Sequence, residues 1–124
     1  MSRQETNAAL AAMLIVLLTA VGVPNPLMAA AQETEIEYLL GALVSSDCTF
    51  IRNEVSMSSL DFQQHLRSKF RRNGELINSA EEFIDKIATR SAESELPYVA
   101  LCNGELRITR EWFMQVLSTY REKN

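Results

Sequence analysis

The sequence predicts a small α+β domain in which about four helices pack on a minimal three-stranded sheet. Three observations support this prediction. Apolar residues recur at helical spacing in four segments, three short segments are rich in strand-forming residues, and Asn103-Gly104 joins two of those strands. The predicted order is α-β-α-α-β-β-α, after an apolar leader over residues 1–31, so the domain comprises residues 32–124.

The leader has the organisation of a secretory signal peptide. Ala8–Val23 carries no charge, prolines follow it, and Ala29–Ala31 supplies the small residues that precede a cleavage site. We therefore predict cleavage after Ala31, export, and no stable membrane span afterwards. The alternative is an uncleaved helix that anchors the chain in the inner membrane. The apolar run could extend through Leu27-Met28, and the side chains of residues 1–7 sum to zero charge.

The part that remains is one domain of 93 residues out of 124, which is enough for a modest core. Removing the leader takes away one arginine and one glutamate, so the net charge stays at −4. Nucleic-acid binding depends on a basic surface, so this balance disfavours nucleic acid as a partner.

Both cysteines, Cys48 and Cys102, lie in this domain. An even pair in an exported chain predicts a disulfide, which would add about 4 kcal/mol to the free energy of unfolding. The alternative is a pair of free or metal-binding thiols. With a single histidine and no C-x-x-C motif, the sequence predicts neither a metal site nor a cofactor.

The N-terminal half of the domain contains two predicted helices and one strand. The first helix covers residues 34–44, with an apolar stripe of Ile36, Leu39, Leu40 and Leu43. The strand is Cys48–Arg52, and Asn53-Glu54 begins a turn. The second helix covers residues 60–72, with Ser58 or Ser59 as its cap, Gly74 as a left-handed stop, and a buried stripe of Phe62, Leu66 and Phe70.

The C-terminal half contains two helices and a hairpin. Ser79 and Glu82 form a capping box that opens a helix over residues 80–91. Strands 98–102 and 105–108 are joined by Asn103-Gly104, a type I′ hairpin signal. Thr109 is expected to cap the last helix, residues 110–121, with Phe113, Val116, Leu117 and Tyr120 inward. Trp112 could be a half-exposed contact residue, but a ring lying over the hairpin is favoured.

Several segments carry a family resemblance. They are Cys48–Asn53, His65–Phe70, Ser79–Ala88, Ser91 with Ser94, and Pro97-Tyr98 followed by Cys102. In this order they resemble DUF5329, a bacterial family of small exported proteins of unknown function. The resemblance covers most of the domain and implies a periplasmic protein of a Gram-negative bacterium. It implies no activity.

The chain departs from the pattern of this family at Glu54 and Glu95, where the family tends to have glycine. A turn that requires positive φ would be strained by glutamate. Either the two turns differ here, or a function of these loops is altered.

The best candidate site lies on the helix over residues 60–72. His65, Lys69 and Arg72 follow i, i+4, i+7 spacing and share one face, and Arg52 lies nearby in sequence. We expect this basic face to be exposed and to bind an anionic small molecule or an acidic peptide. The alternative is a solvated helix face whose cations lie favourably near the helix C-terminus.

The loop before the hairpin adds further candidates. Ser91, Ser94 and Tyr98 could form a polar lip with an aromatic contact, although an ordinary helix-to-strand connection would have the same composition. The sequence therefore favours a non-enzymatic binding or interaction domain and predicts no catalytic residue. The alternative is a small hydrolase-like enzyme that uses His65, the only imidazole, with a serine hydroxyl. An enzyme requires His65 within hydrogen-bond reach of that hydroxyl in a concave pocket.

Overall fold

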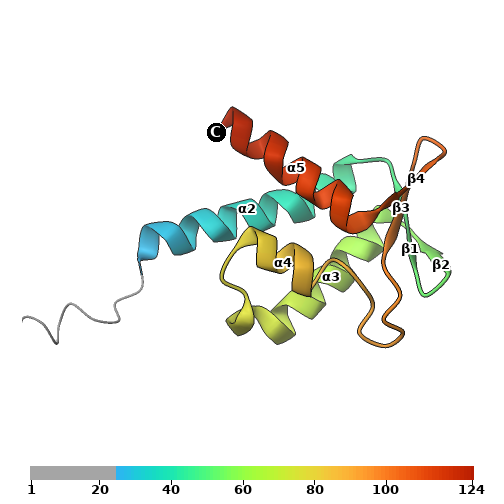
Figure 1. The fold of residues 1–124 in the computed structure, drawn as a ribbon, viewed down its shortest axis with the longest axis horizontal. Coiled ribbons are helices and arrows are strands. Elements are labelled where there is room, and N and C mark those ends of the chain that lie inside the picture. The colour runs from blue at the N-terminus through green and yellow to red at the C-terminus, as the bar shows by residue number, and fades with distance from the viewer. Residues whose placement is uncertain (1–24) are drawn as a thin grey trace, which may run out of the picture.

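The computed structural model describes residues 25–124, so most of the predicted leader lies outside the described residues. Four helices and a four-stranded sheet form the domain, which confirms the α+β class, and the helices lie to one side of the sheet (Figure 1). No helix of this part is long and apolar enough to cross a membrane. The elements are α2 (Pro26–Ser45), β1 (Thr49–Arg52), β2 (Val55–Met57), α3 (Ser59–Asn73), the 3₁₀ helix η1 (Gly74–Leu76), α4 (Ala80–Lys86), β3 (Val99–Cys102), β4 (Glu105–Ile108) and α5 (Thr109–Lys123).

The sheet has the antiparallel order β2-β1-β3-β4, so the predicted count of three strands is wrong. The missed strand, β2, is only three residues long and contains a serine, which leaves too little pattern to identify it. It pairs with β1 through a tight turn in which Asn53 and Glu54 both have positive φ, at 50° and 66°. The predicted β3–β4 hairpin is confirmed, with positive φ at both turn residues, Asn103 and Gly104.

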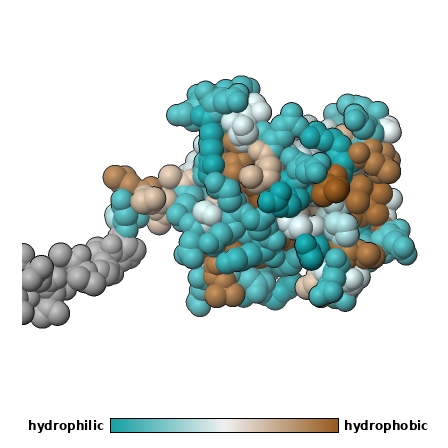
Figure 2. Space-filling model, viewed as in Figure 1, coloured by the Kyte–Doolittle hydropathy of each residue, from teal (hydrophilic) through white to brown (hydrophobic). Residues whose placement is uncertain are grey.

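One face of the sheet supplies the core. Phe50 and Ala100 lie opposite each other on β1 and β3, and both are fully buried beneath the helices. The other face is uncovered and apolar: Leu106 and Ile108 on β4 are 64% and 46% exposed. Hydrophobic surface is accordingly visible at the sheet end of the molecule in Figure 2. The hydrophobic core therefore lies on the helical side alone.

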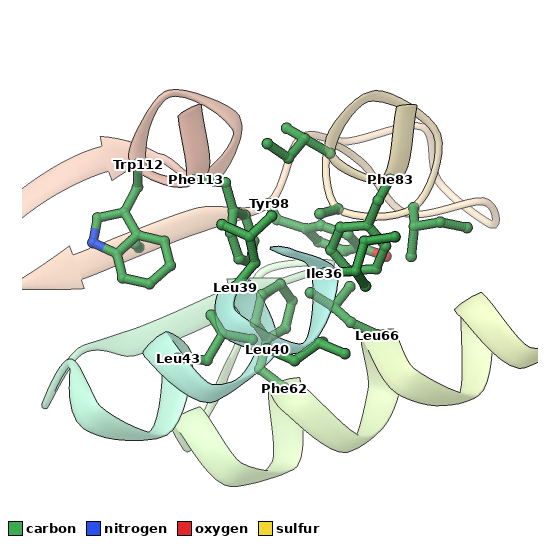
Figure 3. Close-up of a cluster of buried hydrophobic side chains, with 14 of the residues drawn as sticks. Ile36, Leu39, Leu40, Leu43, Phe62, Leu66, Phe83, Tyr98, Trp112 and Phe113 are labelled. Carbon is green, nitrogen blue, oxygen red and sulfur yellow. The ribbon is translucent and has the colours of Figure 1, made fainter. Parts of the chain in front are cut away.

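Helix α2 is the central element of the core. It packs against α3, α4 and α5, and its predicted stripe is buried, as Figure 3 shows for Ile36, Leu39, Leu40 and Leu43. Aromatic rings extend this core to the sheet. Phe62 of α3 stacks on Phe50 of β1 with ring centroids 4.7 Å apart. The helices are thereby fixed to the sheet mainly by side chains that the apolar periodicity had identified.

Trp112 is buried, so the alternative of a half-exposed contact residue is wrong. Its side chain packs edge-on against Phe50, at 5.9 Å between ring centroids, and the residue is 8% exposed. Phe113 is buried as well, whereas Val116 and Tyr120 are only partly buried. Trp112 and Phe113 are buried because α5 follows β4 directly, so the first turn of α5 lies against the sheet.

Two helices differ from prediction at their ends. Helix α2 begins at Pro26 rather than at residue 34, because proline is favourable in a first turn and the Asn25 side chain accepts a hydrogen bond from the Leu27 amide. Its first buried residue is Ile36, so the earlier turns contribute little to the core. Helix α4 ends at Lys86 rather than at residue 91, because the chain turns back toward β3 and the Tyr98 amide donates to the Thr89 carbonyl.

The caps also differ in part. Ser58 and Ser79 cap α3 and α4 as predicted, through bonds from the amides of Asp61 and Glu82. Gly74, however, has φ −60° and continues into η1 instead of adopting a left-handed stop. Thr109 is the first residue of α5 rather than its cap.

The predicted disulfide is present and joins Cys48 to Cys102, whose Cα atoms are 4.4 Å apart. It connects the residue before β1 to the end of β3, and so closes the loop that carries α3 and α4. Closing a loop of this length reduces the entropy of the unfolded chain, which stabilises the domain by about 4 kcal/mol.

Both glutamates that replace the expected glycines adopt the left-handed conformation. Glu54 has φ 66° in the β1–β2 turn, and Glu95 has φ 60° in the loop before β3. Both turns therefore have the positive φ that glycine favours, and each glutamate carries the strain that a Cβ causes in this region.

We predict that Glu54→Gly and Glu95→Gly each raise the free energy of unfolding by about 0.5–1 kcal/mol, because glycine removes this strain. Urea unfolding monitored by circular dichroism measures the change. Glu54→Gln is the matched control: it removes the charge but keeps the Cβ, and should not stabilise. An equal gain in both variants would mean that charge, not backbone strain, is responsible.

Candidate functional site

Six of the seven residues predicted to form a binding site line one pocket of about 300 Å³. They come from three segments: the end of β1, one face of α3, and the loop between α4 and β3. Pairing of β1 with β3 and packing of α3 against β1 bring these segments together. The six residues are Arg52, His65, Lys69, Arg72, Ser91 and Tyr98.

Tyr98 forms the centre of the hydrogen-bond network. Its ring is fully buried, and its hydroxyl lies 3.1 Å from Nε2 of His65 and accepts from Nζ of Lys69 at 3.4 Å. Because the Tyr98 oxygen accepts from Lys69, its hydroxyl proton is available to His65. The Tyr98 hydroxyl therefore donates to Nε2 of a neutral His65. The imidazole proton then lies on Nδ1.

Lys69 is buried, at 8% exposure, so the prediction of a fully exposed basic face is wrong at this residue. Its ammonium group donates to the carbonyl oxygens of Ile87 at 2.9 Å and Arg90 at 2.8 Å, in addition to Tyr98. These three bonds engage all three N–H donors of the group. The long side chain reaches over the aromatic core to the end of α4, which the helical spacing of the sequence cannot indicate.

Arg52, unlike Lys69, is not fully hydrogen-bonded within the described residues. Its Nε is buried and has no hydrogen-bond partner among the described residues. Its Nη2 lies 3.7 Å from a carboxylate oxygen of Glu93, whose side chain is 77% exposed. Such an exposed ion pair contributes little stability, so Glu93 does not hold the guanidinium in a fixed bond. Arg52 thus retains donors that a ligand can use.

The remaining candidates differ in role. Arg72 is exposed on the pocket wall, and Ser91 is buried with its oxygen accepting a bond from the Glu93 amide at 3.3 Å. Ser94 does not line the pocket. Its hydroxyl instead bonds to the side-chain oxygen of Asn53, which fastens the loop to the β1–β2 turn.

The pocket is strongly cationic in a protein of net charge −4. Burial, followed by the charges of Arg52, Lys69 and Arg72, lowers the pKa of His65. Burial and the two arginines likewise lower the pKa of Lys69, whereas burial raises the pKa of Tyr98. Burial is the largest cause for both His65 and Lys69; the neighbouring cations add to it, and Glu93 acts in the opposite direction on the pKa of His65.

The geometry does not assemble the serine-based hydrolase considered above. The hydroxyl beside His65 belongs to Tyr98, and among the described residues no hydrogen bond joins His65 to a serine or a carboxylate. Residues 25–124 also contain no group of three or more histidine, cysteine or acidic side chains placed to hold a metal ion. The arrangement is suited to holding an oxyanion by charge and hydrogen bonds.

Sequence reasoning missed Asn73 and Glu93, which also line the pocket. Asn73 follows Arg72 on α3, but its amide donates back to the Lys69 carbonyl and gives no separate signal. Glu93 lies between Ser91 and Ser94, and its ion pair with Arg52 joins segments that are far apart in sequence.

Comparison with known proteins identifies the family of the chain. Residues 30–121 match a family described as "Family of unknown function (DUF5329)". The chain belongs to DUF5329. An uncharacterized protein, YfeK, of Salmonella typhimurium is 37% identical to this DUF5329 chain over 68 residues, which are 54% of this chain and 57% of that protein. The match thus covers less than two thirds of the relative, and no solved structure matches the chain.

We predict that Lys69→Met lowers the free energy of unfolding by about 1–3 kcal/mol, because two buried carbonyl groups and the Tyr98 hydroxyl lose their donor. Arg72→Met, on the same helix but exposed, should change it by less than about 0.5 kcal/mol. Urea unfolding of both variants measures the difference. Equal values for the two variants would contradict a structural role for Lys69.

Proposed function

We propose that this DUF5329 protein is an exported, periplasmic, non-enzymatic domain that binds a small oxyanion, of the phosphate or carboxylate class, in the pocket beside α3. The observation that carries the proposal is the excess of positive charge in this pocket, which within residues 25–124 is lined by Arg52, Lys69 and Arg72 against the single carboxylate of Glu93. The guanidinium of Arg52 pairs with the exposed Glu93 only through a 3.7 Å contact, so its Nη groups are suited to hold an anion.

The pocket favours a small ligand over an extended surface. Its volume of about 300 Å³ is at the lower end of the range of small-molecule sites. Arg52, Arg72 and Nδ1 of His65 can donate to a ligand, whereas Lys69 contributes charge only, since its donors are engaged. An acidic peptide would therefore have to insert a single carboxylate. The hydrolase alternative is less well supported because His65 bonds to Tyr98 instead of a serine.

Calorimetric titration with sulfate, phosphate and acetate tests this site. We predict that Arg52→Gln and Arg72→Gln each weaken binding about 10-fold or more, because each removes a charge-assisted hydrogen bond. Arg71→Gln is the matched control, since Arg71 is an exposed neighbour on α3 that does not line the pocket. The proposal fails if none of the three anions binds, or if Arg71→Gln is as harmful as the other two.

The pH dependence of sulfate binding gives a second readout, since sulfate does not itself titrate near neutrality. Burial, and then the charges of Arg52, Lys69 and Arg72, lower the pKa of His65, and among the described residues Glu93 opposes them. A bound anion favours the protonated imidazole, so affinity should rise as pH falls from about 7.5 to about 5.5. His65→Gln should flatten this dependence, and an unchanged slope would exclude His65 from the site.

Export is the second part of the proposal. The apolar leader and the disulfide support it, because disulfides persist in oxidising compartments. Cleavage after Ala31 would remove only exposed residues from the described part of α2, whose first buried residue is Ile36. The core would therefore remain complete in the mature protein.

We predict that protein recovered from the periplasm has the intact mass of a chain that begins at Gln32. Cleavage needs small residues before the cut, so replacing Ala29 and Ala31 together by Gln should retain the leader. A wild-type chain of full length that stays with the membrane fraction would instead support the anchored alternative.

A further inference from the structure

We propose that the groove between α2 and α5 is a second binding site, which takes a single-chain amphiphile with an anionic head group, such as a fatty acid. It is separate from the cationic pocket beside α3 and shares no lining residue with it. The inference therefore does not depend on the proposed oxyanion site.

The groove is the larger of the two spaces, with a volume of about 710 Å³, within the usual range of small-molecule sites. Helices α2 and α5 contact each other, and Figure 1 shows their course. Side chains of both helices line the groove, together with both cysteines of the disulfide. Its apolar lining is contributed by Tyr38, Ala42, Trp112, Val116 and the Cys48–Cys102 bridge.

Gly41 is the observation that points to a ligand. It lies in the interior of α2, where glycine is less favourable than alanine by about 1 kcal/mol. Packing within residues 25–124 does not require it, because a Cβ at this position would meet no atom of this part of the chain within 4 Å. Gly41 lines the groove, so its missing side chain leaves the α2 wall open. Gly41 thus lowers the stability of α2, and what the described residues gain from it is free space in the groove.

The charge of the groove selects the class of ligand. Among the lining residues within 25–124, Arg107 alone is charged at neutral pH, and it lies on β4 opposite Ala100 of the strand that ends at Cys102. Its Nη2 donates to the Gln115 side chain at 2.6 Å, which orients the guanidinium without neutralising it. A lone cation beside an apolar groove complements an aliphatic chain with one anionic end. A free phosphate would leave the apolar walls without a partner.

Intrinsic fluorescence can test the site, because Trp112 is the only tryptophan in the chain and lines the groove. The mature protein is titrated with dodecanoate below its micelle concentration. We expect a saturable change in Trp112 emission and one bound molecule per chain by calorimetry. Calorimetry also detects binding that leaves the emission unchanged, and absence of saturable binding by both methods would overturn the proposal.

Gly41→Leu is the decisive variant. It fills the groove while improving the helix propensity of α2, so binding should weaken at least 10-fold without loss of the fold. Glu33→Leu is the matched control, since it adds the same side chain to an exposed position of α2 outside the groove. Circular dichroism confirms folding of both variants. Unchanged dodecanoate affinity in Gly41→Leu would place the ligand elsewhere and overturn the site.

The head group is tested with ligands of equal chain length. Dodecanoate should bind more tightly than dodecanol or dodecyltrimethylammonium, and Arg107→Gln should remove this preference. Equal binding of the cationic amphiphile would refute an anionic head group. Arg52→Gln should leave dodecanoate binding unchanged, and a loss there would show that the fatty acid occupies the pocket beside α3 instead.

Discussion

The buried ammonium group of Lys69 joins two of the three segments that surround the cationic pocket, α3 and the chain between α4 and β3. From α3 it reaches the carbonyl oxygens of Ile87 and Arg90 just after α4, and the hydroxyl of Tyr98 just before β3. Helix α4 ends where these carbonyls turn toward the lysine. The loop to β3 and the buried position of Tyr98 therefore depend on a charge that the helical pattern places on the surface.

This contact divides the basic residues into two groups. Lys69 is fully hydrogen-bonded within the protein, and its charge lowers the pKa of His65 without offering a donor to a ligand. Arg52 and Arg72 keep donors available beside it. A charge that is fixed in place and already hydrogen-bonded does not have to reorganise when an anion arrives, so it favours binding at little entropic cost.

The sequence predicts the parts of this fold that have a periodic or local signal. The stripe of α2, the caps Ser58 and Ser79, the Asn103-Gly104 turn and the disulfide were all identified from such signals. Strand β2 was missed because it is stabilised by pairing with β1 and has little pattern of its own. The burial of Lys69 was missed because it depends on contacts eighteen or more residues away. The sequence did group Arg52, His65, Lys69 and Arg72 as candidate binding residues because they are close in sequence, but it predicted an exposed face and not a pocket.

The two turns that contain the strained glutamates lie next to residues of the cationic pocket. Glu54 follows Asn53, whose side chain bonds to Ser94, and the Glu95 amide donates to the carbonyl of Ser91. The left-handed conformation persists in both glutamates because these bonds, and the pairing of Arg90 with Pro97, determine the path of the loops. One of these loops carries Ser91 and Glu93, and the other begins directly after Arg52 at the end of β1. The same bonds that impose strain on the glutamates therefore help to hold these three residues opposite the α3 face of the pocket, which helix geometry alone could not do.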